Sequence, residues 1–363
     1  MNSSQFMSGT ADLPLHGGSA PAWLFQRMED LGGAISELIV REYGRDEYLE
    51  RLSDPYWFQA FGCVLGFDWH SSGLTTTTMG ALKEALDLGE LGVAVAGGKG
   101  KNAWRTTEEL EESVTGTSDL ERLKEASRTS ASVDGSCVQD GHELYHHTLI
   151  FSEDGEWTVV QQGMSDEYAR RYHWSSLDDP GFLDDPQSGI AAMERRGEVL
   201  DLSSRGSRET RQVSLDLVRD DPAHLERYVK KQSTLEDFTG KELKMPDHHR
   251  LKLEDLSTRS IRQLERAYEE DPEDYEELLK TDGVGKKSLR ALALIAELVH
   301  GSESSWEDPA KYSYAHGGKD GTPYPVDRER YDRSIEELEN AVREKVDGKE
   351  ERKALERLGD LRS

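Results

Sequence analysis

The spacing of apolar side chains predicts a chain built mainly from amphipathic helices. The first clear helix is expected over residues 22–43, where apolar residues recur three and four positions apart: Trp23, Leu24, Met28, Leu31, Ile35, Leu38 and Ile39. A second, short helix is expected over residues 47–52 and must end before Asp54-Pro55. The same reasoning predicts helices at 79–91, 106–130, 208–229 apart from its proline, from 256 onward, and at 328–346.

A stretch in the middle of the chain has the alternating pattern of β-strands instead. Residues 148–151 and 156–161 alternate, and the sequence Ser-Glu-Asp-Gly between them is typical of a hairpin turn. One further short strand is expected at 92–96. The predicted class is therefore α+β, mostly α-helical, with a small antiparallel β element in the middle and a C-terminal helix-hairpin-helix domain.

The expectation of that C-terminal domain comes from the pattern around Gly283-Val284-Gly285. A short apolar run precedes the two glycines, and a longer helical run starts at Lys286. Glycine permits a positive φ and a close backbone approach. The first amides of the second helix and the positive end of its dipole then face outward together, an arrangement that binds phosphate.

Basic and hydroxyl side chains lie at the same place. The predicted DNA-binding set of the hairpin is Gly283, Val284, Gly285, Lys286, Ser288 and Arg290, and Lys287 adds a further cation beside it. The alternative is a helical hairpin with a glycine turn and a solvated basic edge. A second candidate phosphate contact is the sequence Gly-Gly-Lys-Gly-Lys at 97–101, expected as a loop after the strand at 92–96. Its Lys99 and Lys101 could contact a DNA backbone, or the loop could simply be a flexible basic one.

These patterns divide the chain into five regions. They are a mainly helical domain at 1–130, a polar region with the β-hairpin at 131–200, a connector at 201–255, the helix-hairpin-helix domain at 256–346 and a charged tail at 347–363. A chain of 363 residues is long enough for several such units.

The charge balance is strongly acidic and changes how a DNA-binding hypothesis must be framed. The chain has 45 Lys and Arg against 72 Asp and Glu, a net charge of −27. Phosphate contact needs local positive charge. Either the protein has a basic partner, or its surface is adapted to high salt, as in halophilic archaea, and keeps cations where they are used. The even spread of acidic residues favours the second interpretation.

Composition also limits the other classes of protein. The two cysteines, Cys63 and Cys137, have neither metal-pair spacing nor a disulfide framework. No apolar run reaches membrane-spanning length, and the N-terminus does not resemble a signal peptide. We expect a cytoplasmic protein with no cofactor and no membrane contact, and with DNA as its partner, bound through the backbone with little sequence specificity.

A dense set of polar side chains surrounds the predicted β-hairpin. Its members are Asp68, His70, Asp140, His142, His146, His147, Gln161, Gln162, Arg170, Arg171 and His173. Three interpretations remain open: a satisfied hydrogen-bond network, a lining that grips nucleic acid, and a metal site with Asp140, His142, Glu143 and His146. The adjacent His146 and His147 should point to opposite faces of a strand. No metal is predicted.

Several long motifs resemble an uncharacterised family of archaeal and bacterial proteins, domain-of-unknown-function family 763. They include ADLPLHGGSAPAWLF, DPYWFQAFGCVLGFDWHSSGLTT, VAVAGGKGK, LYHHTLIF, VVQQGM and GVGKKSLRALALIAEL. The resemblance covers nearly the whole chain and implies no established activity.

A local resemblance is more informative about function. The sequence GVGKKS is similar to the hairpin of helix-hairpin-helix DNA glycosylases, which places Lys287 where the bifunctional members carry a catalytic lysine. The sequence YPVDRER places Asp327 where that class has an aspartate, although the separation is longer here. The resemblance implies a DNA-repair protein, a base-excision glycosylase or AP lyase using a lysine Schiff base. Aromatic residues that could hold an extruded base are Trp306, Tyr312 and Tyr324. The alternatives are a non-catalytic DNA-binding module and a metal-dependent nuclease.

Overall fold

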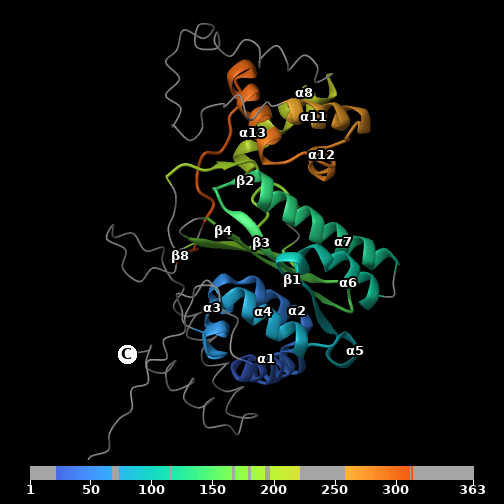
Figure 1. The fold of residues 1–363 in the computed structure, drawn as a ribbon, viewed down its shortest axis with the longest axis vertical. Coiled ribbons are helices and arrows are strands. Elements are labelled where there is room, and N and C mark those ends of the chain that lie inside the picture. Colours follow the sequence, from blue (N-terminus) through green and yellow to red (C-terminus); the bar gives the residue numbers. More distant parts are fainter. Residues whose placement is uncertain are drawn as a thin grey trace, which may run out of the picture.

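The computed structural model is α+β, with helices on both faces of a twisted sheet (Figure 1). It describes residues 22–67, 73–114, 117–165, 168–178, 181–192, 197–220, 258–310 and 312–313. None of the described helices is both long and apolar enough to span a membrane.

The central sheet is larger than the sequence predicts. It has six strands, all neighbouring pairs being antiparallel except the last, in the order β1 (Val93–Lys99), β3 (Glu143–Ser152), β4 (Trp157–Met164), β5 (Ala169–Ser175), β6 (Gly189–Ala192) and β8 (Tyr312–Ser313). The predicted hairpin is confirmed as β3 and β4. A separate two-stranded sheet pairs β2 (Val138–Gln139) with β7 (Leu200–Asp201).

The N-terminal helices cover the lower face of the sheet. Val93, Val95, Ile150 and Val160 face this layer and share one buried cluster with it. The helices are α1 (Ala22–Tyr43), α2 (Arg45–Ser53), α3 (Pro55–Val64), α4 (Leu74–Ala85) and the single turn α5 (Leu88–Leu91). The expected helix at 79–91 is therefore wrong in its bounds, because residues 86–87 are extended and separate α4 from α5.

The remaining helices cover the upper face. They are α6 (Thr106–Ser113), α7 (Thr117–Ser132), the π-helical turn η2 (Val133–Cys137), α8 (Arg208–Arg219), α11 (Thr258–Glu270), α12 (Tyr275–Lys280), α13 (Lys286–Ile295) and the π-helical turn η6 (Ala296–His300). The predicted helix at 208–229 is confirmed only as far as α8, since residues beyond 220 and the helix expected at 328–346 lie outside the described residues.

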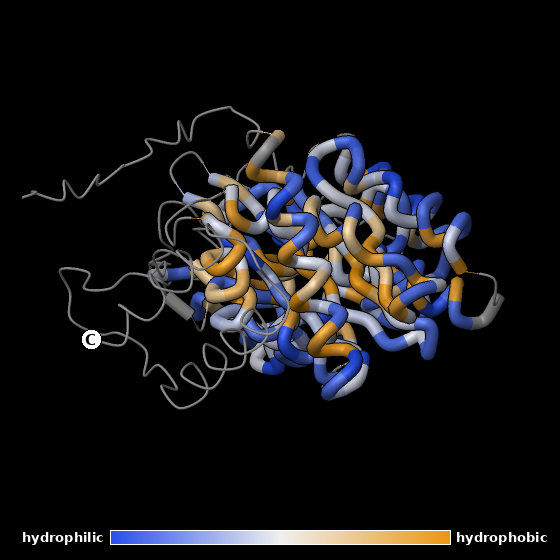
Figure 2. The backbone as a smooth tube through the Cα atoms, turned by 90° about the horizontal axis from the view of Figure 1, so that it is seen from below, coloured by the Kyte–Doolittle hydropathy of each residue, from blue (hydrophilic) through white to orange (hydrophobic). Residues whose placement is uncertain are grey.

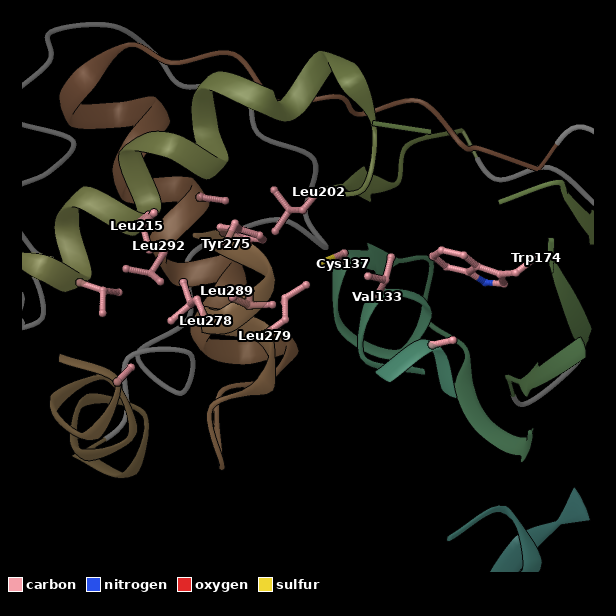
Figure 3. Packing of buried hydrophobic residues seen from close by; sticks show 14 of the residues in the cluster. Val133, Cys137, Trp174, Leu202, Leu215, Tyr275, Leu278, Leu279, Leu289 and Leu292 are labelled. Atoms are coloured by element: carbon pink, nitrogen blue, oxygen red, sulfur yellow. The ribbon is translucent and has the colours of Figure 1, made fainter. Parts of the chain in front are cut away.

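One buried cluster joins the upper face of the sheet to the hairpin helices. Leu289 and Leu292 of α13 and Leu278 of α12 belong to the same cluster as Trp174 of β5 and Val133 of η2, and Figure 3 shows these side chains. In Figure 2 the hydrophobic segments gather inside while hydrophilic positions form most of the outer turns. The hairpin is therefore packed against the sheet layer through a shared core, while the five predicted domain boundaries stay predictions.

Candidate functional site

The turn between α12 and α13 leaves the start of α13 open. Gly283 has a φ of 92°, which favours glycine, and an added Cβ would lie 3.0 Å from the side chain of Gln263. Gly285 is the N-cap of α13 with an extended φ of −155° and no side-chain cap bond. A Cβ added at Gly285 would meet no atom within 4 Å. The positive φ expected of both glycines thus holds only at Gly283, and Gly285 instead leaves room for an approach from solvent.

The side chains of this turn differ in their surroundings. Val284 packs against the upper hydrophobic cluster, and Ser288 is buried. Arg290 is half-buried, whereas Lys287 is exposed in the first turn of α13. Lys287 is therefore the hairpin cation most accessible to a ligand.

Lys286 fixes the start of α13 to the start of β3. Its Nζ lies 2.6 Å from Oε1 of Glu143 and 3.4 Å from the carbonyl oxygen of His142. Its own carbonyl accepts a hydrogen bond of 2.9 Å from Nε2 of Gln139. The side chain predicted to contact phosphate is thus engaged in docking the hairpin onto the sheet.

The glycine-rich segment after the first strand is not a loop, which corrects the sequence prediction. Gly97, Gly98 and Lys99 continue β1 and pair with Thr148, His147 and His146 of β3. A Cβ at Gly97 would lie 2.4 Å from the carbonyl oxygen of His147, so this glycine is required by close packing. The amide of Gly97 donates to Glu109 at 2.7 Å, and this contact ties the strand to α6.

Lys99 and Lys101 lie where β1 ends. Lys99 is the last strand residue, and its Nζ lies 5.8 Å from the ring centroid of Tyr145. Lys101 is exposed in the 3-10 turn η1 (Gly100–Arg105). Because β1 runs antiparallel to β3, this end of β1 lies beside the start of β3, where Lys286 contacts Glu143.

Two segments far apart in sequence thus contact the same end of β3. Lys99 pairs opposite His146, three positions along β3 from Glu143. At a rise of roughly 3.3 Å per residue, this separation along the strand is about 10 Å. The structure therefore places the β3 contacts of the two candidate phosphate-binding segments three positions apart, which the sequence could not show.

The dense polar set divides between the two faces of the sheet. Ser127 Oγ of α7 lies 2.8 Å from Nε2 of His147, so His147 faces the upper layer. Arg171 contacts Gln59 and Thr75 of the lower layer. His146 pairs with Gln162, which pairs with Arg171 of the lower face, so His146 and His147 lie on opposite faces as expected.

A buried ion network occupies the upper face near β2. Arg170 donates Nη1 to Asp140 Oδ2 at 3.0 Å, and it grips both oxygens of Asp308 at 2.9 and 2.8 Å. The hydroxyl of Tyr172 donates to Asp140 at 2.6 Å. Burial favours the neutral form of Asp140, but the hydrogen bond from His142 and the charge of Arg170 hold its pKa below the usual value. Among the described residues, Nε of Arg170 and Nδ1 of His142 have no hydrogen-bond partner, but the pairing of Arg170 with two buried aspartates favours a structural role for it.

A second buried chain crosses the same layer from α7 to η2. Ser127 is hydrogen-bonded to His147, whose Nδ1 donates to Gln161 Oε1 at 3.0 Å. Gln161 Nε2 donates to Asp134 Oδ2 at 2.6 Å. Burial lowers the pKa of His147 to about 4, so the imidazole is neutral and can accept the serine proton. Serine and histidine are placed as a nucleophile and a base would be, but Ser127 is only 4% exposed and out of reach of a substrate.

Asp134 ends this chain of hydrogen bonds and has a strongly raised pKa. Its carboxylate accepts three hydrogen bonds, from Gln161, Trp174 Nε1 at 2.8 Å and Gln187 Nε2 at 2.9 Å. Burial raises the pKa of Asp134 to about 8, helped by the charges of Asp140 and Asp201. Asp134 lies in η2, where no sequence pattern marked it.

The lower face holds the other half of the polar set. Arg171 donates to Gln59 Oε1 at 2.9 Å, to the carbonyl of Pro55 at 3.0 Å and to His173 Nε2 at 2.7 Å. Burial and the charge of Arg171 keep the pKa of His173 well below its usual value. These contacts favour the satisfied-network interpretation for this face as well.

The metal-site interpretation required His146 to join Asp140 and His142. His146 lies on the lower face, whereas Asp140 contacts Arg170 and Tyr172 on the upper face. Over the described ranges, no three His, Cys, Asp or Glu side chains come together in a way that could hold a metal ion.

Some predicted site residues fall elsewhere or outside the described ranges. Trp306 is half-buried and donates Nε1 to Glu297 at 3.0 Å, so it is a packing residue of η6. Asp68, His70, Tyr324 and Asp327 lie outside the described residues, and only the backbone of Tyr312 is described.

Comparison with known proteins places the chain in one family. Residues 9–326 match the model of a family described as proteins of unknown function, DUF763. The chain belongs to this family. No curated protein and no solved structure matches it. The DUF763 match covers both candidate phosphate-binding segments and the polar networks, and Asp327 lies just beyond it.

Within this DUF763 chain, sequence reasoning missed several residues that the fold brings into these networks. Asp134, Ser127, Gln187 and Asp308 carry no local motif, because their partners lie on other elements. Trp104 could have been noticed, since it lies among the cations of Lys-Gly-Lys-Asn-Ala-Trp-Arg.

Proposed function

We propose that this protein binds the sugar–phosphate backbone of DNA with little sequence specificity. The hairpin turn before α13 and the end of β1 would each hold phosphates. The observation that carries the proposal is that both segments contact the same end of β3, Lys99 opposite His146 and Lys286 at Glu143.

The pairing of cations supports this proposal. Many of the described lysines and arginines form ion pairs with carboxylates, for example Lys83 with Glu109 and Lys286 with Glu143. By contrast, Lys99, Lys101 and Lys287 form no ion pair with any residue in the described ranges. In a chain of net charge −27, lysines without a carboxylate partner are the groups available to phosphate.

The open start of α13 supports it further. Gly285 has no side chain to block an approach, and the first amides of α13 have no acceptor within the helix. In a salty medium, hydrogen bonds from backbone amides persist better than contacts between exposed charges. The hairpin would then contribute directional bonds and Lys287 a charge.

The test is the substitution Gly285→Val. Valine accepts the extended backbone at this position, so the fold should be preserved while the side chain blocks the amides. We expect duplex affinity, measured by fluorescence anisotropy, to fall at least about tenfold, which corresponds to roughly 1.4 kcal/mol. The matched control is Gly197→Val, another glycine whose added Cβ meets nothing within 4 Å. Equal affinities of the two variants would remove the hairpin from the binding site.

The second candidate function is a base-excision glycosylase or AP lyase that uses Lys287. Its support is the exposed amine in the first turn of α13, beside the proposed phosphate contacts. The amine would attack the sugar aldehyde of an abasic site and lose water to form an iminium, which borohydride reduces to a stable adduct. A second role, stabilising charge on the sugar, is proposed for Asp327.

Trapping distinguishes this candidate from a non-catalytic module. Wild-type protein with borohydride and abasic DNA is expected to give a covalent adduct, and Lys287→Gln should give none while retaining most of its DNA affinity. The neighbouring Lys280→Gln is the control, because Lys280 is engaged with Glu125. If trapping persists in Lys287→Gln, or is absent in the wild type, catalysis by Lys287 is excluded and the non-catalytic DNA-binding module is the remaining candidate.

A further inference from the structure

The most exposed large apolar side chain in the described part of the protein is Trp104. It is 86% exposed, whereas the next in order, Tyr43, is 51% exposed. Trp104 lies in η1, immediately after the end of β1. Isolated exposed apolar residues are common, but an indole this fully exposed on an ordered turn is a candidate contact surface.

The turn that carries Trp104 is held in place by local packing. Gly100 has a φ of 61°, and an added Cβ at Gly98 would lie 3.1 Å from Cβ of Asn102, so the turn folds closely against the strand. At the other end, the hydroxyl of Thr106 donates to the carbonyl of Ala103 at 2.9 Å. The indole is therefore presented on a built turn between β1 and α6.

Cations flank this tryptophan in the sequence of an otherwise acidic chain. Residues 99–105 contain Lys99, Lys101 and Arg105 and no acidic residue, although the whole chain has a net charge of −27. Arg105 is paired with Glu108 at 3.4 Å, which leaves the two lysines as the cations without an ion-pair partner among described residues. The local charge is complementary to a polyanion and disfavours a basic partner.

We propose that Trp104 stacks on an unpaired base while Lys99 and Lys101 contact the flanking phosphates. An aromatic side chain beside a basic groove is the combination by which proteins hold single-stranded nucleic acid. In an intact duplex every base face is already stacked, so an indole can stack only on a base at an end, a gap, a bulge or a single strand. The proposal rests on the proposed function and adds a preference for unpaired DNA.

The test compares a (dT)15 single strand with a covalently closed circular duplex, which has no ends, using wild type, Trp104→Ala and Trp104→Phe. Stacking on one base contributes about 1–3 kcal/mol, so Trp104→Ala should weaken (dT)15 binding roughly five- to 150-fold. Trp104→Phe should recover most of it, and duplex affinity should change less than about twofold. The control is Tyr268→Ala, which removes another exposed aromatic, on α11, and should change neither.

Fluorescence supplies the second readout. The wild-type signal minus that of Trp104→Phe reports the indole of Trp104, which should be quenched by acrylamide in the free protein and protected by (dT)15. Protection already present in the free protein would mean that another part of this chain or a second copy covers the indole, and would overturn the proposal.

The two proposals can fail separately. Unchanged (dT)15 binding in Trp104→Ala, with duplex binding still lost in Gly285→Val, would overturn the stacking proposal and leave the backbone-binding function. Loss of (dT)15 binding in Trp104→Ala, with no effect of Gly285→Val on duplex affinity, would support stacking by Trp104 and would exclude the hairpin from the DNA-binding site.

Discussion

At the scale of single residues, Asp134 makes the sharpest prediction about stability. Its pKa is about 8 in the folded protein, against an ordinary value of 3.8. Between these values the unfolded chain has released the proton that the folded protein keeps, so stability falls as pH rises through the window. One such group contributes about 1.4 kcal/mol per pH unit.

The substitution Asp134→Asn should remove this dependence. In denaturant titrations at pH 5, 6, 7 and 8, the free energy of unfolding of the variant should increase relative to that of the wild type as pH rises. His147 changes stability in the opposite sense, since its lowered pKa destabilises the fold as pH falls below 6.5. Taking the difference between the two proteins cancels that contribution. A difference independent of pH would mean that Asp134 is ionised in the fold.

Individual buried residues also show where sequence reasoning stops. Arg170 and Arg171 belong to the dense polar set for which a nucleic-acid lining was one interpretation. In the fold, Arg170 meets Asp308, which is far away in sequence, and Arg171 meets Gln59. Pairing across such distances is set by tertiary packing, so a local pattern could identify the polar set but not its division between two faces.

At the scale of elements, periodicity identified what short-range spacing determines. The helix at 22–43 and the hairpin of β3 and β4 are confirmed because each buries a face with a regular apolar period. β5 was missed because its Arg-Arg-Tyr-His sequence looks solvent-exposed, although these side chains are buried against polar partners on other elements. The predicted strand at 92–96 ends before β1 does, because Gly97 and Gly98 suggested a loop. In the fold these glycines continue the strand, and close packing against β3 and α6 leaves no room for a side chain at Gly97.

The same scale explains the hairpin. The turn sequence correctly predicted two helices separated by glycines, and Gly283 adopts the positive φ that the pattern implied. What the sequence could not supply is the surface that the hairpin meets. Lys286, predicted as a phosphate contact, pairs with Glu143 of β3, so Lys287 becomes the accessible cation.

At the scale of the whole molecule, charge and architecture act together. A net charge of −27 repels a polyanion at long range, so the proposed DNA binding has to depend on a local surface where cations have no carboxylate partner. Lys99, Lys101 and Lys287 come from segments almost 190 positions apart, and the sheet brings their segments to one end. This arrangement is the central claim about function.

The salt dependence of duplex affinity tests that claim most directly. Each lysine that neutralises a phosphate adds about 0.9 to the slope of log K against log salt. Replacing Lys99, Lys101 and Lys287 together by glutamine should therefore flatten the slope by about 2–3. A control protein with Arg41, Arg128 and Arg208 replaced by glutamine loses the same charge from exposed positions on α1, α7 and α8. We predict that the control keeps the wild-type slope. Equal slopes for the lysine variant and the wild type, or equal flattening in both variants, would contradict a phosphate path at this end of the sheet.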